Sequence, residues 1–288
     1  MKWLRSVISI STQNFRKWQT DYRVWCIGFV LVSMTAIFID DLRSVVNVAG
    51  AEMPVWIFPF LYSQDNTKLL FTLPMVLLFC SAPFLDKNQT FVFVRTGRVK
   101  WLCGQILYIV TASAVHYLFI LAVSLLLTVF SGGFSLEWGE TLKILATSGD
   151  LRKLLGSVGL ELSNFVLTFF TPLQAVWFTF LLSWLGGIFI GLTIFACNLI
   201  SGTKYLGVTV SSYFVLFSYI TVNEGYGQGM LRFSPMSWIT LDKIDVGHTT
   251  KNPSFTYCVS VFAGLITVLI AVILIFGRKK SLDVGGDQ

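Results

Sequence analysis

The chain has 288 residues, of which 55% are hydrophobic and only 12% are charged. A soluble globule of this length needs more polar side chains to cover its surface, so the composition excludes a soluble domain and indicates an integral membrane protein. We attribute the net charge of +6 to a membrane face that contacts anionic lipid, and not to nucleic acid.

Residues 1–23 precede the first long apolar run and carry apolar side chains at helical spacing, with basic residues such as Arg5 and Arg16 on the opposite face. This pattern is typical of an amphipathic helix that lies in the inner membrane interface. Trp3, Phe15 and Trp18 are its expected interfacial residues.

Six apolar runs without Asp, Glu, Lys or Arg follow, at about residues 24–39, 69–84, 105–130, 173–200, 206–223 and 255–276. A bilayer core about 30 Å thick needs roughly 17 to 25 such residues. Continuous apolar runs favour helices over barrel strands, which alternate apolar and polar residues. The predicted fold is an all-α integral membrane protein, with six transmembrane helices in one domain over residues 24–276.

Most of the Lys and Arg residues lie in the N-terminal segment, in the loop after the second span, at Lys204 and in the tail, residues 277–288. Short basic loops face the cytosol in membrane proteins. An even number of spans then places both termini in the cytosol, and we expect a multi-pass protein of the plasma (inner) membrane.

Two of the segments expected on the outer side of the membrane have sequence patterns that predict their position. Aromatic residues cluster between Pro54 and Tyr62, and we interpret them as an interfacial belt in preference to a ligand pocket. Ser148 is typical of a helix start, and apolar residues recur at helical spacing over residues 150–171. This pattern predicts a second interfacial helix, on the outer leaflet. A segment that dips into or crosses the bilayer is the alternative.

The loop between the second and third spans holds Asp86, an apolar stretch that includes Phe91 and Phe93, and the basic residues Arg95 and Arg98. We expect a short cytosolic helix followed by a turn. It is the only cytosolic segment between spans that is long enough for a helix.

His116, in the third span, is the only ionisable side chain in any predicted span. A hydrogen bond to a neighbouring helix is the simpler interpretation. The alternative is a residue of the transport pathway, because ion-driven transporters need ionisable groups within the membrane.

The sequence holds no GxxxxGK[ST] phosphate-binding loop, no HExxH motif and no paired Cys or His at metal-ligand spacing. We therefore expect no ATPase site, no metal and no cofactor in this chain. Its five cysteines lie in or near spans, which argues against a disulfide framework.

Taken together, the chain resembles the permease subunits of bacterial type-2 ABC exporters. The resemblance rests on six spans with both ends inside, the amphipathic N-terminal helix, the outer Pro235 before the last span, and the loop order of an acid at Asp86, an apolar stretch and the basic patch Arg95-Thr96-Gly97-Arg98.

This resemblance implies a subunit that moves cargo outward, powered by separate cytosolic ATPase subunits that bind ATP and Mg. It implies a second permease copy, identical or similar, and assigns ATPase coupling to Asp86, Phe91, Phe93, Arg95 and Arg98. An amphipathic or hydrophobic peptide, such as a bacteriocin or toxin peptide, is the first expected cargo, and a drug or lipid the second. An intramembrane lipid-linked enzyme and a non-transporting anchor or sensor are the alternatives.

Overall fold

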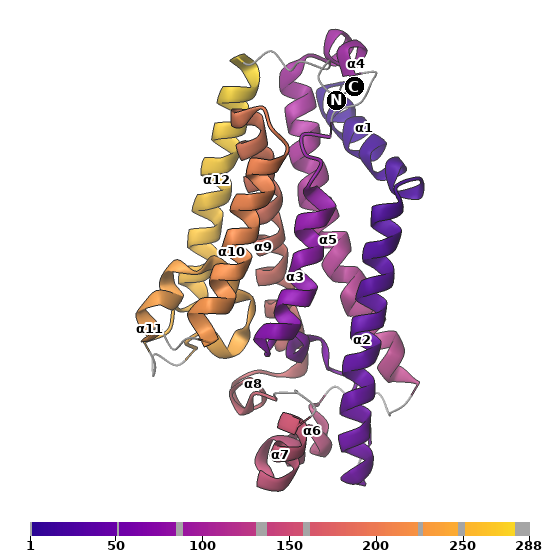
Figure 1. Cartoon of the computed structure of the whole chain (residues 1–288), viewed down its shortest axis with the longest axis vertical. Coiled ribbons are helices and arrows are strands. Elements are labelled where there is room, and N and C mark those ends of the chain that lie inside the picture. The colour runs from indigo at the N-terminus through magenta and orange to yellow at the C-terminus, as the bar shows by residue number, and fades with distance from the viewer. Residues whose placement is uncertain are drawn as a thin grey trace.

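The computed structural model describes residues 2–50, 52–84, 89–130, 137–157, 162–223, 227–246 and 251–279. Within these ranges the chain forms α-helices and short 3-10 helices, and no β-strand (Figure 1). Backbone groups in lipid must be bonded within the segment, which favours helices over strands in apolar runs of this kind. The prediction of an all-α membrane protein is confirmed at this level.

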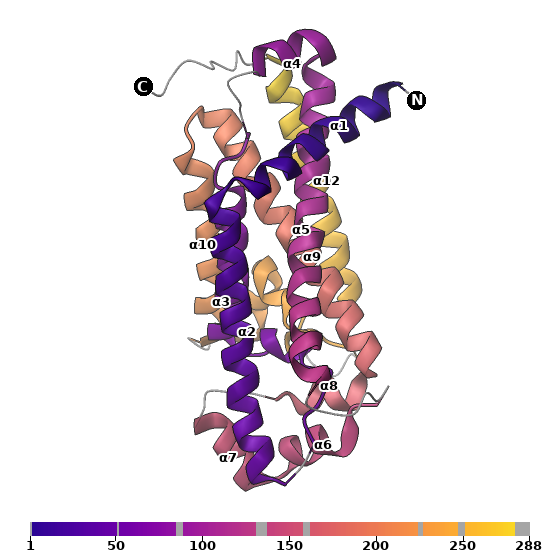
Figure 2. The ribbon, with the colours of Figure 1, turned by 90° about the vertical axis from the view of Figure 1, so that its right-hand side faces the viewer.

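Four helices are long and apolar enough to cross a membrane, namely α2 (Tyr22–Val48), α5 (Arg98–Val129), α9 (Pro172–Ser201) and α12 (Phe255–Lys279). Two shorter apolar helices, α3 (Asp65–Phe79) and α10 (Tyr205–Asn223), run along the same axis (Figures 1 and 2). Successive helices among these six point in opposite directions.

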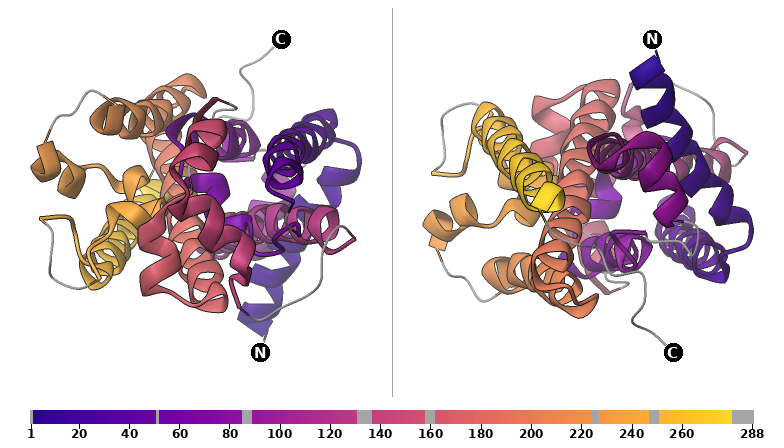
Figure 3. Two further views of the ribbon diagram at one scale, coloured as in Figure 1. Left: turned by 90° about the horizontal axis from the view of Figure 1, so that it is seen from below. Right: turned by 90° about the horizontal axis from the view of Figure 1, so that it is seen from above.

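The helix α9 forms the centre of this bundle. It packs against α3, α5, α10 and α12, and lies among them when viewed along the long axis (Figure 3). In the most apolar window of α9, 72% of residues are buried, against 11% in α12. A Cβ atom on Gly191 would lie 2.5 Å from a side-chain carbon of Ile109, so this glycine lets α5 approach closely.

Local signals explain where the central helix begins and ends. Thr171 caps its start by accepting a hydrogen bond from the backbone of Gln174, whose side chain accepts one from the Thr171 backbone in return. Pro172 occupies the first turn, where a missing N–H costs little. Gly202, at φ 78°, closes the C-terminus in the left-handed conformation.

One end of the molecule carries α1 (Lys2–Arg16), the 3-10 turn η1 (Lys17–Gln19) and α4 (Gln89–Thr96). The last turn of α12 lies at the same end, which is the basic end predicted for the cytosol (Figure 1).

The opposite end is covered by short helices. α6 (Gly139–Thr147), α7 (Gly149–Ser157) and α8 (Asn164–Phe169) lie beyond the bundle (Figures 1 and 2), and α7 also contacts α2. The single outer helix expected over residues 150–171 is therefore divided. Ser163 has an extended backbone, with φ −78° and ψ 114°, and a new helix starts after it.

Buried turns enter the bundle from this end. They are η2 (Phe58–Tyr62) and η4 (Pro235–Ile239), and every residue of both is buried. The short elements α11 (Gly227–Met230), η3 (Leu231–Phe233) and η5 (Leu241–Lys243) flank η4. The aromatic segment expected as an interfacial belt thus packs in the core, because η2 folds inward against α3, α5 and α9.

Gly207 generates a prediction about how α9 and α10 are joined. Its backbone N–H donates to Asn198 Oδ1 over 2.8 Å, and the Asn198 amide donates in turn to the Ala82 carbonyl. A Cβ atom at Gly207 would collide with the backbone oxygen of Ile194. We expect Gly207→Ala to destabilise the protein by about 1–3 kcal/mol, measured by thermal unfolding in detergent.

Gly264→Ala is the matched control, since no atom lies within 4 Å of a Cβ atom at that position on α12. Its melting temperature should stay the same or rise slightly, as alanine favours the helix. Equal melting temperatures for the two variants would contradict the close contact of α10 with α9.

Candidate functional site

The helix α4 extends from the basic end of the bundle and packs against α5 (Figures 1 and 2). Gly97 links the two helices at φ 81°, a conformation that favours glycine. The Gly97 N–H donates to the Phe93 carbonyl, and the Gly97 carbonyl accepts from the Trp101 N–H. The turn is therefore hydrogen-bonded on both sides, so α4 is held at a defined angle to α5.

Phe93 anchors α4 to the bundle. Its ring meets the edge of Trp101 with centroids 5.0 Å apart, and Trp101 is only 1% exposed. Trp101 contacts Phe195 of the central helix α9 in the same edge-on manner, with centroids 6.3 Å apart. These three rings form a continuous aromatic contact from α4 to the core of the bundle.

Phe91 and Val94 lie three residues apart on α4 and are 77% and 85% exposed. Arg95 beside them is also exposed. Residues at this spacing share one face of a helix, so α4 presents two large apolar side chains and a cation away from the bundle. Exposed apolar side chains that stand beside a cation occur at sites that contact a protein partner or a membrane surface.

Arg98 connects the start of α5 to the end of α12. Its guanidinium Nη1 donates to the Arg278 carbonyl oxygen over 3.3 Å. Cations at helix C-termini bond to carbonyls that have no intrahelical partner. Arg98 thus fixes two helix ends together, while Asp86, the acid predicted to share this site, lies outside the described residues.

The N-terminal helix α1 packs against the same part of α5. Val7 and Ile10 are buried there, and a Cβ atom on Gly104 would lie 2.6 Å from Ile10 Cγ2. Asn14 donates to Gln105 Oε1 over 2.6 Å in a buried hydrogen bond. Apolar packing and a buried amide pair together fix α1 on α5.

The three predicted interfacial residues separate into two groups. Trp3 is 48% exposed on the outer face of α1. Phe15 and Trp18 instead pack on Tyr108 of α5: the Phe15 and Tyr108 centroids are 5.1 Å apart, and the Trp18 indole donates to the Tyr108 hydroxyl over 2.7 Å. Only Trp3 has the exposure expected of a side chain in the interface.

Asp21 and Arg23 mark the junction between η1 and α2. The carboxylate accepts from Arg23 Nε at 3.1 Å and Nη2 at 2.8 Å. These hydrogen bonds hold the pKa of Asp21 below its ordinary value. The Arg23 guanidinium also donates to Cys80 Sγ at the end of α3, so the pair connects the start of α2 to its neighbour.

His116 lies far along α5 from this site. Its side chain is buried, and Nε2 lies 3.4 Å from the Phe71 carbonyl of α3. It therefore makes an interhelical contact and joins none of the other predicted site residues.

A cavity of about 500 Å³ opens at the opposite end, where the segment after α2 faces the start of α6. Trp56 and Trp138 line it together with Glu52, Glu137 and Glu140. Among the described residues, no group of three or more His, Cys, Asp or Glu side chains is arranged to hold a metal ion.

No family model matches the chain, and no curated protein matches it. The arrangement at the basic end is therefore the main guide to function. Sequence reasoning found the residues of α4, but it missed Trp101, Gln105 and Tyr108, through which α4 and α1 are attached to α5. The available signal was the aromatic and amide side chains at or just before the start of the expected third span.

The buried amide pair yields a prediction. Asn14→Ala leaves Gln105 Oε1 without its donor inside the protein, which should lower stability by about 1–3 kcal/mol. Replacing both residues by Leu should restore most of the loss, because two apolar side chains need no partner. Thermal unfolding, together with protease cleavage of α1, measures both effects.

Thr12→Ala, on the exposed face of α1, is the control and should change neither measurement. If the double Leu variant is as unstable as Asn14→Ala, the amide pair is not what holds α1 in place.

Proposed function

We propose that the chain is the membrane-spanning permease subunit of an ATP-driven type-2 ABC exporter. The observation that carries this proposal is α4. It extends beyond the bundle, exposes Phe91 and Val94, and is attached to the core through Phe93 and Trp101. A helix placed this way can receive a cytosolic partner and pass its movement into the spans.

Six spans are proposed for the topology, with α3 and α10 completing the four long helices. α10 packs against both α3 and α9, inside the same bundle. At 15 residues, α3 is about 22 Å long and shorter than the bilayer core. The buried residues of η2, which leads into α3, extend this apolar layer outward.

The basic end is assigned to the cytosol, which places both termini there and the short helices α6 to α8 outside. This orientation follows from the Lys and Arg residues of α1, of α4 and of the start of α5. The membrane is proposed to be the plasma (inner) membrane.

Two routes would transmit movement from the ATPase. The first runs from α4 through Phe93 and Trp101 to Phe195 on α9. The second runs along α5 to α1, which contacts it through Gln105 and Tyr108. Since both routes share the first turns of α5, closure of two ATPase subunits would move α5 and α1 together.

The partner subunits would bind ATP and Mg, and a second copy of this permease, or a similar one, would complete the membrane part. Charged residues of the long helices lie toward their ends: Arg98 and Lys100 are in the first turn of α5, and Asp40, Asp41 and Arg43 are in the last third of α2. An apolar or amphipathic cargo suits such a bundle, with a hydrophobic peptide as the first candidate and a drug or lipid as the second.

Docking on α4 is tested by Phe91→Ala combined with Val94→Ala. Burial of each side chain against a partner contributes about 1.5–3 kcal/mol, so the double variant should bind its ABC ATPase at least about tenfold more weakly. ATP-driven transport in proteoliposomes should fall equally, with the melting temperature unchanged because neither side chain packs in the fold.

Phe233→Ala is the matched control, a phenylalanine that is 75% exposed at the other end of the molecule. It should leave ATPase binding intact. Phe93→Ala should retain binding in part but uncouple ATP hydrolysis from transport, because it detaches α4 from Trp101. Full binding and transport by the Phe91 and Val94 variant would exclude α4 as the docking site.

The energy source is tested by His116→Ala. If ATP hydrolysis drives transport, the variant should still move cargo with ATP and no ion gradient. It should lose only about 1 kcal/mol of stability from the interhelical contact. Transport in vesicles that runs on a proton gradient without ATP, and disappears in the variant, would show an ion-coupled transporter instead.

A further inference from the structure

Four buried hydroxyl groups among the described residues have no hydrogen-bond partner: those of Tyr62, Tyr117, Thr179 and Ser183. All four side chains are 0% exposed. An unpaired buried hydroxyl is unfavourable, and most buried polar groups in proteins are bonded. Four such groups in one apolar bundle therefore need an explanation.

Other buried Ser and Thr side chains in the helices avoid this problem. Their hydroxyls donate to a carbonyl three or four residues earlier, as at Thr35, Thr72, Ser113, Ser124, Thr128 and Thr193. The same local bond is open to helical Ser and Thr in general. Thr179 and Ser183 do not make it, so their hydroxyls differ from those six.

The four hydroxyls come from elements that pack together. The rings of Tyr62 on η2 and Tyr117 on α5 have centroids 6.3 Å apart. Tyr117 Cε2 lies 2.9 Å from where a Cβ atom would stand on Gly187 of α9. Ser183 and Thr179 precede Gly187 by one and two turns, which places them on the same face of α9.

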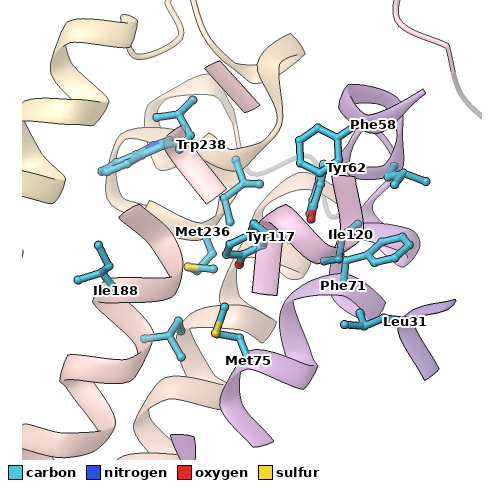
Figure 4. Close-up of a cluster of buried hydrophobic side chains, with 14 of the residues drawn as sticks. Leu31, Phe58, Tyr62, Phe71, Met75, Tyr117, Ile120, Ile188, Met236 and Trp238 are labelled. Atoms are coloured by element: carbon cyan, nitrogen blue, oxygen red, sulfur yellow. The ribbon is translucent and has the colours of Figure 1, made fainter. Parts of the chain in front are cut away.

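The surroundings of this cluster are adaptable. Met75 Cε lies 3.0 Å from the Cβ position of Gly187, and Met236 Cε lies 3.5 Å from that of Gly186. Figure 4 shows both methionines beside Tyr117, with Tyr62 on the other side of that ring. Methionine side chains can change shape at little energetic expense, and they are frequent at sites that bind varied apolar ligands.

We propose that the hydroxyls of Tyr62, Tyr117, Thr179 and Ser183, with Met75 and Met236, form a binding site inside the bundle. The ligand is a neutral, mainly apolar molecule with hydrogen-bond acceptors, such as the carbonyls of a hydrophobic peptide. The hydroxyls donate to these acceptors while the methionines move aside to enclose the apolar part. No charged group of the ligand is needed.

This site gives the cargo class of the proposed exporter, and to that extent it rests on the proposed function. Binding itself needs no ATPase, so it can be measured on the purified chain in nanodiscs. Failure of ATPase docking and failure of this site are then separate results.

The probe is tritiated N-acetyl-trileucine amide in a scintillation proximity assay. Unlabelled amide should displace it, whereas pristane, a branched alkane without acceptors, should not. Tyr62→Phe and Tyr117→Phe should each weaken binding about tenfold, the effect of one lost hydrogen bond. Each should also raise the melting temperature of the unliganded protein, because phenylalanine removes an unpaired hydroxyl.

Tyr108→Phe is the matched control. Its hydroxyl accepts from the Trp18 indole, so this variant should lower the melting temperature and leave probe binding unchanged. The proposal is overturned if the native chain does not bind the probe, if pristane competes equally, or if the Tyr62→Phe, Tyr117→Phe double variant binds normally. Lower stability of the two single variants would also overturn it, by showing that the hydroxyls are already paired.

Discussion

The close approach of α5 to α9 is the contact on which the rest of the structure depends. Glycines at 187 and 191 leave space for Tyr117 and Ile109, so the two backbones come closer than larger side chains would allow. Helices in lipid gain little from the hydrophobic effect and associate through such packing. α5 is held at its middle by α9, and its first turns, which carry α4 and α1, are also held by Trp101 on Phe195 of α9 and by Arg98 on the end of α12.

Two parts of α5 therefore contact different elements. The inner part of α5 bears the side chains that face helices of the membrane core, including His116 and Tyr117. Its first turns bear Trp101, Gln105 and Tyr108. Trp101 contacts α4, Gln105 contacts α1, and Tyr108 contacts η1. The rings of Phe93, Trp101 and Phe195 connect α4 to α9, which supports the proposed route of movement.

The sequence was sufficient to identify an all-α membrane protein, because long apolar runs report directly on a bilayer. It did not identify η2 as a buried turn. Aromatic residues near a membrane surface pack in an interfacial belt or in a core, and the composition of residues 54–62 is the same in both cases. Only the contacts of η2 with α3, α5 and α9 decide between them.

The sequence pattern predicted the helix α4, but it did not predict how α4 and α1 are attached to α5. Phe91, Phe93 and Arg95 of α4 stand together in the sequence, so their pattern predicted a short helix in this loop. The contacts that hold α4 and α1 join residues far apart: Asn14 to Gln105, and Trp18 to Tyr108. No local pattern reports such a pairing, because each partner also fits an ordinary interfacial or lipid-facing position.

Both α1 and α4 leave large apolar side chains exposed, yet the two helices differ in what can cover them. On α1, Trp3, Leu4 and Ile8 are about half exposed. The helix has 15 residues, and its other side is fixed along α5. α4 has only 8 residues, extends beyond the end of α5, and exposes Phe91 more fully. These differences support the proposal that lipid covers the outer face of α1 and that a protein partner covers α4.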